Sequence, residues 1–345
     1  MSHLIGRMTP RMVKRGVGRV RAEGVRAKVL GDLRRIARSG RPVIAGPWLG
    51  EVGFEILYWV PFLRWALARV QIDPSRVVAV SRGGPASWYT GLADRYVDVF
   101  DVMPLATYRD GNEVRRRIVG EQKQLHTTPF DDDIARRAAD YAGVAHAEVL
   151  HPSLMYRLMR PFWWKHASER WVFRHARPAR LTPSAPPPAL ALPRGSYIAT
   201  KFYFNDCLEP SPDVRKKCAA VIDALGRRLP VVSLNADIQI DDHAGETHAA
   251  VQTLAGHVSV RDNLDVQTAV MANARAFVGT YGGFSYLAPL TGVPARALYS
   301  VENGFDRAHL HIARSTIARI DGPSYELGDL MTVDPDAFAD EVVSL

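Results

Sequence analysis

One stretch in the second half of the chain constrains its fold more than any other. Residues 276–279 form a run typical of a short buried strand, and a glycine-rich turn follows it. A helix is predicted to begin near Phe284 and to end before Gly292 and Pro294, and a second buried strand is predicted at 297–301. A strand, a turn, a helix and a strand in this order indicate an α/β domain with a parallel sheet.

The glycine turn has the features of an anion-binding site. Glycine accepts positive φ angles and close backbone contacts. The first N–H groups of a helix, together with the positive end of its dipole, point at whatever lies above the strand ends. The alternative is a plain connection between a strand and a helix. If the turn binds phosphate, the residues that form the donor site are Gly279, Thr280, Tyr281, Gly282, Gly283 and Ser285.

A proline-rich segment divides the chain into two α/β halves. Residues 178–195 have the composition of a linker. Residues 42–177 are predicted to form a Rossmann-like acceptor domain, and residues 196–345 a Rossmann-like nucleotide-sugar-binding domain. Residues 1–41 are predicted to form a basic helical arm. The predicted fold class is α/β, with two doubly wound Rossmann-like domains that face a cleft.

Apolar runs and turn signals predict the individual elements. Ser211 followed by Pro212 is a typical helix start, with Gly226 at the other end of the apolar stripe. Strands are expected at 42–45, 77–80, 96–102, 196–200, 231–234 and 258–260, and further helices at 25–36, 87–95, 113–124 and 131–142.

The net charge of +8 is distributed unevenly along the chain. The first 41 residues carry twelve lysines and arginines against two carboxylates. In a second basic stretch, residues 154–180, aromatic side chains and methionines are interleaved with cationic side chains. Cations with aromatics suit the surface of an anionic membrane or a lipid-linked acceptor. The alternatives are a solvated arm and a helix between domains whose aromatic side chains pack on the core. No nucleic-acid motif is present, so no nucleic-acid partner is expected.

Cysteine usage and hydropathy restrict the compartment. Cys207 and Cys218 provide neither a disulfide framework nor a metal-binding spacing, which favours a reducing cytoplasm. The first residues lack the apolar run of a secretory signal. The longest uncharged run, 276–295, contains four glycines and two prolines, which excludes a membrane-spanning helix there. We expect a cytoplasmic protein, at most peripheral at the inner face of the cytoplasmic membrane.

Residues 272–294 resemble a known donor-binding segment. They read ANARAFVGTYGGFSYLAPLTGVP. This run resembles the pattern ARAxFVVSxDTGxxHLAAAxGxP of the lipopolysaccharide heptosyltransferases (glycosyltransferase family 9) and related GT-B glycosyltransferases. Tyr281 and Gly282 stand where that family has Asp and Thr, and Tyr286 where it has His. These departures also allow a neighbouring clan.

The resemblance implies a glycosyltransferase that moves a sugar from a nucleotide-activated donor to a glycan or glycolipid. It implies an inverting reaction without a metal, and a nucleotide-sugar as substrate rather than a bound cofactor. A weaker match lies in the first half, where Gly50, Glu51 and Val52 resemble the family's acidic GD(V/L) motif, with Glu in place of Asp. In the resembling enzymes a basic residue near the position of Lys201 contacts the diphosphate.

Sugar transfer needs a base for the acceptor hydroxyl and neutralisation of the departing diphosphate. Glu51 is the candidate base, because Gly50 and Gly53 flank it on a loop that follows the first strand. Glu55 is its competitor, and the alternative for Glu51 is a cap on the next helix. Further donor-site candidates are Lys201, Tyr203, Asn205, Asp262, Asn263 and Gln267, and candidates for the acceptor site or cleft are Trp48, Arg82, Asp242 and His243.

Other functions are less compatible with the sequence or stay open. Asp241, Asp242 and His243 have metal-ligating side chains, but three consecutive ligands rarely converge, so no metal is expected. His309 and His311 are expected at the surface or within a helix. Neither a Walker A motif nor a dinucleotide fingerprint is found. A non-catalytic protein of the same fold that binds a sugar nucleotide or a partner, and a sugar-nucleotide epimerase of this fold, remain alternatives.

Overall fold

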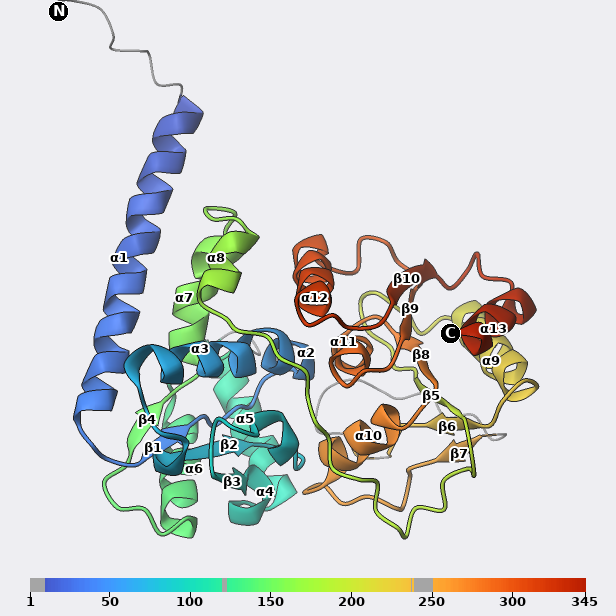
Figure 1. Ribbon diagram of the computed structural model, residues 1–345, viewed down its shortest axis with the longest axis horizontal. Helices are drawn as coiled ribbons and strands as arrows, with labels where there is room; N and C mark the ends of the chain where they lie inside the picture. The colour runs from blue at the N-terminus through green and yellow to red at the C-terminus, as the bar shows by residue number, and fades with distance from the viewer. Residues whose placement is uncertain (1–9, 120–122, 237, 239–250) are drawn as a thin grey trace, which may run out of the picture.

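The computed structural model describes residues 10–119, 123–236, 238 and 251–345. Two α/β domains lie next to each other, and the long helix α1 runs along the outer edge of the first (Figure 1). Each domain contains one sheet, and every strand pair within the sheets is parallel. The predicted fold class, two parallel-sheet α/β domains, is therefore confirmed.

The first domain has a four-stranded sheet in the order β3-β2-β1-β4. Its central strands β1 and β2 consist of buried residues throughout, which is typical of parallel strands covered on both faces. The strands are β1 (Val43–Ala45), β2 (Val77–Ser81), β3 (Arg95–Asp98) and β4 (Glu148–Leu150), and the helices are α1 (Pro10–Arg38), α2 (Val52–Phe54), α3 (Val60–Val70), α4 (Val99–Val102), α5 (Leu105–Val119), α6 (Pro129–Tyr141), α7 (Ser153–Trp163) and α8 (Glu169–Arg174), with a π-helical turn at Glu55–Trp59 between α2 and α3.

The second domain has a six-stranded sheet in the order β10-β9-β8-β5-β6-β7. The glycine turn predicted from the sequence lies between its strand β8 and its helix α11. The strands are β5 (Ile198–Lys201), β6 (Val231–Ser233), β7 (Gln252–Thr253), β8 (Ala276–Thr280), β9 (Ala295–Tyr299) and β10 (Tyr325–Asp329), and the helices are α9 (Pro212–Gly226), α10 (Asn263–Ala272), α11 (Gly283–Leu290), α12 (Arg307–Arg319) and α13 (Pro335–Ser344).

The order of strands determines where each sheet can bind a ligand. In the first sheet the chain proceeds from β1 to β2 and β3 on one side, then returns to place β4 on the other side of β1. In the second sheet β6 and β7 lie on one side of β5, and β8, β9 and β10 lie on the other. Parallel sheets bind ligands beyond the carboxyl ends of the strands at such switch points. The loops after β1, β5 and β8 are therefore the positions where a site is expected.

The basic arm is a helix that is partly integrated into the first domain. Its C-terminal half contacts α7 and α3 through buried apolar side chains, among them Val29, Leu33 and Ile36. Arg35 of α1 also pairs with Glu148 at 2.7 Å between Nη1 and Oε2. The N-terminal turns of α1 extend past the rest of the fold (Figure 1). None of the helices within the described ranges is long and apolar enough to cross a membrane.

Several predicted elements differ from the observed ones. The helix expected at 87–95 is only a short 3₁₀ turn, Ala86–Tyr89, because Gly83, Gly84 and Gly91 take positive φ angles around it. The strand expected at 96–102 ends at Asp98, whose carboxylate accepts a hydrogen bond from the Phe100 N–H and begins α4. Residues 258–260 contain no strand, and the edge of the second sheet is β7 instead. Strand β4 was not expected from the sequence.

The predicted start of α9 is confirmed and allows a test of local stability. The Ser211 hydroxyl accepts a hydrogen bond from the Val214 N–H at 3.2 Å. Ser211→Ala should lower the free energy of unfolding of the second domain by about 1 kcal/mol, because the helix loses its cap. Ser211→Asp should keep the stability, since aspartate also caps helices. Chemical unfolding of the full chain measures this; equal stability of the Ala variant and the parent would contradict the role of the cap.

Candidate active site

The loops beyond the switch points of both sheets enclose one cavity of about 560 Å³ between the two domains. It brings together most of the polar side chains that were predicted for the donor site and the cleft. The predicted residues that line it are Glu51, Arg82, Lys201, Tyr203, Asn205, Asn263, Gln267, Tyr281, Gly282 and Gly283. Asp242 and His243 lie outside the described residues.

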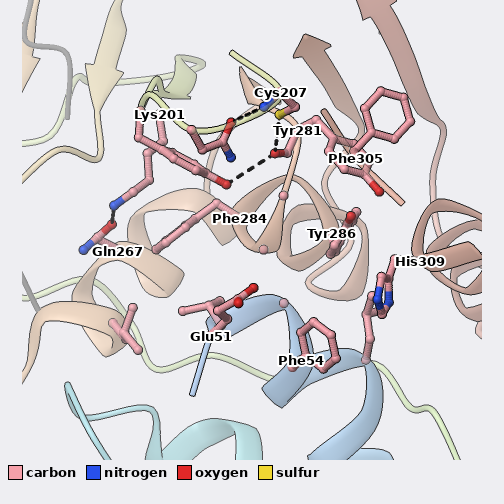
Figure 2. A pocket seen from close by; sticks show the side chains of 18 of the residues that line it. Glu51, Phe54, Lys201, Cys207, Gln267, Tyr281, Phe284, Tyr286, Phe305 and His309 are labelled. Atoms are coloured by element: carbon pink, nitrogen blue, oxygen red, sulfur yellow. Dashed lines mark hydrogen bonds between the residues drawn. The ribbon is translucent and has the colours of Figure 1, made fainter. Parts of the chain in front are cut away.

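Figure 2 shows that the cavity has two chemically different ends. Lys201 and Gln267 lie at one end, which we call the polar end. At the other, the aromatic end, lie Phe54, Tyr281, Tyr286, Phe305 and His309. Glu51 lies between the two ends (Figure 2).

A hydrogen-bonded chain positions the cation of the polar end. The ammonium group of Lys201, at the carboxyl end of β5, donates a hydrogen bond to the Gln267 side-chain oxygen. The Gln267 amide in turn donates to Asn263 Oδ1 at 2.5 Å, and both residues belong to α10. The Lys201 ammonium also lies 4.0 Å from the centre of the Phe284 ring, a cation–π contact. Two groups therefore orient Lys201 directly, and Asn263 in turn orients Gln267.

The glycine turn requires glycine for steric reasons. Gly282 has a φ angle of 151°, and a Cβ atom on it would lie 2.0 Å from the hydroxyl oxygen of Tyr203. A Cβ atom on Gly279 would lie 2.3 Å from the Lys201 carbonyl oxygen. The Ser285 hydroxyl donates to the Gly282 carbonyl oxygen at 2.8 Å and accepts from its N–H at 3.1 Å. The sequence of the turn therefore fixes the start of α11 at the edge of the cavity.

Three predicted donor-site residues support this turn and do not line the cavity. These residues are Gly279, Thr280 and Ser285. The Thr280 hydroxyl accepts a hydrogen bond from the Tyr203 N–H at 2.9 Å and donates one to the Tyr203 carbonyl oxygen at 2.8 Å. Asp262 is also absent from the lining, because its carboxylate accepts a hydrogen bond from the Ser259 N–H at 2.6 Å.

The helices α2 and α11 begin against each other at two glycines. A Cβ atom on Gly283 would lie 2.7 Å from the Gly53 nitrogen, and one on Gly53 would lie 3.3 Å from the Gly283 Cα. Only residues without a side chain allow this approach of two backbones. The N-termini of two helices, each with the positive end of its dipole, therefore meet at the cavity.

Glu51 occupies the position just before α2. Its backbone is extended, with φ of −69° and ψ of 146°, and its side chain makes no capping hydrogen bond to the helix. The alternative of a helix cap is therefore not observed. The side chain is exposed and lines the cavity. Burial, with a smaller contribution from the nearby Glu51 charge, raises the pKa of Tyr203 well above its ordinary value, which keeps that phenol protonated.

Glu55, the competing candidate base, does not face the cavity. Its side chain is buried, and its Oε1 accepts hydrogen bonds from the Ser81 hydroxyl at 2.6 Å and the Tyr89 hydroxyl at 2.5 Å. Its location on the same helical segment, one turn after Glu51, directs the carboxylate towards β2. Glu55 is therefore a structural residue in this arrangement.

Two further residues of the predicted cleft hold the loop that carries Glu51. The buried Arg82 guanidinium donates to the Gly50 carbonyl oxygen at 2.5 Å and also lines the cavity. The Trp48 ring does not line the cavity, because it is fully buried and stacks on Trp59 and Tyr156 at centroid distances of 5.9 and 6.1 Å. Arg82 thus holds this loop from the cavity side, and Trp48 holds it from the core.

The expectation that His309 is only a surface or helix residue was incomplete. His309 belongs to α12 but lines the aromatic end, where its Nδ1 is hydrogen bonded to the Tyr58 hydroxyl at 2.7 Å. Burial lowers the pKa of His309 to about 4, so the imidazole is neutral at neutral pH. Phe54 and Tyr58 were also missed, although their spacing of four residues on a helix was a readable signal of a shared face.

Within the described parts of the chain, no group of three or more histidine, cysteine, aspartate or glutamate side chains could hold a metal ion. The predicted triplet from Asp241 to His243 lies outside those parts. The lysine and arginine side chains that line the cavity are Lys201, Arg82 and Arg109.

Comparison with known proteins gives matches only at the level of solved structures. No protein-family model matches the chain, and no curated protein does. The ADP-heptose lipopolysaccharide heptosyltransferase II of E. coli is 12% identical with a TM-score of 0.46, covering 88% of this chain and 98% of that one. A glycosyl transferase family 9 protein of Veillonella parvula is 15% identical with a TM-score of 0.46, and the match covers 88% of this chain and 97% of that one. The glycosyltransferase SnogD of Streptomyces nogalater is 16% identical with a TM-score of 0.36, and the match covers 88% of this chain and 98% of that one.

The contact between Gly53 and Gly283 gives a test of the domain interface. Gly283→Ala should destabilise the protein by about 1–3 kcal/mol, because the new methyl group is forced against the Gly53 backbone. Gly226→Ala at the end of α9 is the matched control, since no heavy atom lies within 4 Å of its Cβ position. Melting temperatures of the two variants provide the comparison. Equal melting temperatures would show that the two domains do not need this close approach.

Proposed function

We propose that this protein is a glycosyltransferase that uses a nucleotide-activated sugar. The observation that carries the proposal is the single cavity in which Glu51 from the first domain lies between the cation of Lys201 and the aromatic end. Transfer of a sugar requires a base near the acceptor hydroxyl and positive charge near the leaving diphosphate, and both must reach the same anomeric carbon.

The polar end supplies the groups that a leaving diphosphate needs. The N-terminal end of the α11 dipole is positive, and so is the Lys201 ammonium. The first N–H groups of a helix are also hydrogen-bond donors that have no partner inside that helix. Asn235, Asn263 and Gln267 line the same cavity with amide groups, which suit the hydroxyl groups of a ribose. We therefore assign the nucleoside diphosphate of the donor to this end, with its charge neutralised by the protein and without a metal.

Glu51 is assigned as the general base. Its carboxylate accepts the proton of the acceptor hydroxyl while that oxygen attacks the anomeric carbon and the bond from carbon to diphosphate oxygen breaks. Attack from the side of Glu51, away from the diphosphate at the glycine turn, inverts the configuration at that carbon. The aromatic end then receives sugar rings, because aromatic side chains cover the apolar faces of such rings. The acceptor is a glycan or a glycolipid.

Lys201→Met removes the charge at the polar end and keeps most of the side-chain volume. Affinity for the cognate nucleoside diphosphate should fall about 10- to 100-fold, since hydrogen bonds to charged groups contribute about 1.5–3 kcal/mol. The measurement is a thermal-shift titration with a panel of nucleoside diphosphates and nucleotide-sugars, because a ligand of the native state raises the melting temperature.

The matched control for this variant is Lys216→Met on α9, an exposed lysine outside the cavity lining, which should bind like the parent. If no nucleotide of the panel raises the melting temperature of the parent protein, the proposed function is wrong. If nucleotides bind Lys201→Met as tightly as the parent, the diphosphate is held elsewhere.

Glu51→Gln should lower turnover about 10²- to 10⁴-fold, because the amide cannot accept the proton of the acceptor hydroxyl. Nucleotide affinity should stay nearly unchanged, since the diphosphate is assigned to the other domain. Release of nucleoside diphosphate from the donor found in the thermal-shift screen, with glycan and glycolipid acceptors, measures turnover.

Two glutamates serve as controls for this variant. Glu113→Gln at the exposed surface of α5 should have parental activity. Glu55→Gln should lower the melting temperature, since two buried hydroxyl groups lose their carboxylate partner. Near-parental turnover of Glu51→Gln would remove Glu51 from the mechanism. A parent protein that binds donor but transfers to no acceptor would favour the non-catalytic alternative.

A further inference from the structure

Two consecutive tryptophans at the end of α7 have different surroundings. The ring of Trp163 packs against Phe54 and Tyr58, with centroid distances of 5.8 and 5.5 Å, and so supports the aromatic end of the cavity. The next residue, Trp164, is 61% exposed, and the Arg160 guanidinium lies 5.0 Å from its ring centre. The end of α7 therefore connects the cavity with an outward-facing aromatic side chain.

Exposed cations lie close to Trp164 along the chain. Lys165 follows it in the turn, and Arg170 lies on α8; both are exposed. Helix α1 passes next to this turn, because a Cβ atom on Gly18 would lie 3.5 Å from the His166 Cβ, and its exposed Arg21 follows Gly18 by about one helical turn. We call Arg21, Arg160, Trp164, Lys165 and Arg170 the tip surface.

The tip surface has little compensating negative charge. Glu23 of α1 is paired with Arg26 and Arg174 at 3.0 and 2.9 Å, and Glu169 of α8 is 2.7 Å from His311. Across the part of the chain that the structure describes, no carboxylate lies within salt-bridge distance of Lys165 or Arg170. The positive charge of this region is therefore available to an external anion.

We propose that the tip surface docks reversibly on an anionic lipid bilayer. An exposed indole with a guanidinium against its ring matches the interface between lipid headgroups and acyl chains, where tryptophan is favoured. Each lysine or arginine near an anionic surface adds to the attraction. Figure 1 shows that one edge of the molecule carries both the turn between α7 and α8 and the N-terminal turns of α1. Such a projecting edge suits a flat surface, whereas single-stranded nucleic acids require a groove.

The position of the tip surface also suits the proposed function. The entry of an acceptor from the docked side, described next, rests on that function. Glu169 of α8 accepts a hydrogen bond from Ser315 of α12 at 2.9 Å, and α12 carries His309 at the aromatic end. The docked surface is thus one helix away from the end of the cavity assigned to sugar rings. A lipid-linked acceptor would reach the cavity from this side. The docking itself does not depend on any activity of the cavity.

The experiment is co-sedimentation of the full chain with vesicles of phosphatidylcholine alone or mixed with phosphatidylglycerol, at low and high salt. The parent should sediment with the mixed vesicles at low salt and be released at high salt, because salt screens the attraction. Lys165→Gln/Arg170→Gln should lower the partition coefficient about 30-fold, the equivalent of about 1 kcal/mol for each cation. Trp164→Ala should also reduce binding to the mixed vesicles at low salt, because the indole no longer enters the interface.

Matched variants separate docking from general effects. Lys216→Gln/Lys217→Gln on α9 makes the same change in charge, and Tyr141→Ala removes an aromatic side chain that is 60% exposed on α6. Both should sediment like the parent, and circular dichroism checks that every variant is folded. Recovery of the parent in the supernatant with all vesicles would overturn the proposal. So would equal losses in tip and control variants, or binding to a labelled single-stranded RNA without binding to vesicles.

Discussion

The close approach of Gly53 and Gly283 is the contact on which the rest of the site depends. A side chain at either position would separate the two backbones, because a Cβ atom on Gly283 would lie 2.7 Å from the Gly53 nitrogen. With two glycines, helices α2 and α11 begin against each other. The loop after β1 and the turn after β8 then share one cavity, although each belongs to a different sheet.

Buried polar contacts hold both sides of this cavity in position. In the first domain Arg82 binds the Gly50 carbonyl oxygen beside Glu51. In the second domain Gln267 links Lys201 to Asn263. Polar groups buried in this way are stable only when they are hydrogen bonded, so their partners also define their orientation.

The aromatic end joins the cavity to the surface of the first domain. Trp163 packs against Phe54 and Tyr58, and Tyr58 is hydrogen bonded to His309 of the second domain. Because burial keeps the imidazole of His309 neutral, this end carries no histidine charge at neutral pH. The two ends of the cavity therefore differ in chemistry: the Lys201 ammonium lies at one end, and aromatic side chains predominate at the other.

The sequence by itself determined the features that depend on neighbouring residues. Apolar runs located β1, β2, β5 and β8, Ser211 located the start of α9, and the glycines located the turn before α11. Only the tertiary structure decided which side chains meet. Glu51 and Glu55 are the same residue type one helical turn apart, yet only Glu51 lines the cavity, since the side chains of Ser81 and Tyr89 bind Glu55. Tyr58 and His309 lie 251 residues apart, and no local pattern encodes their contact. Periodicity and capping act within a few residues, whereas a site between two domains is created by packing of segments that the sequence does not bring together.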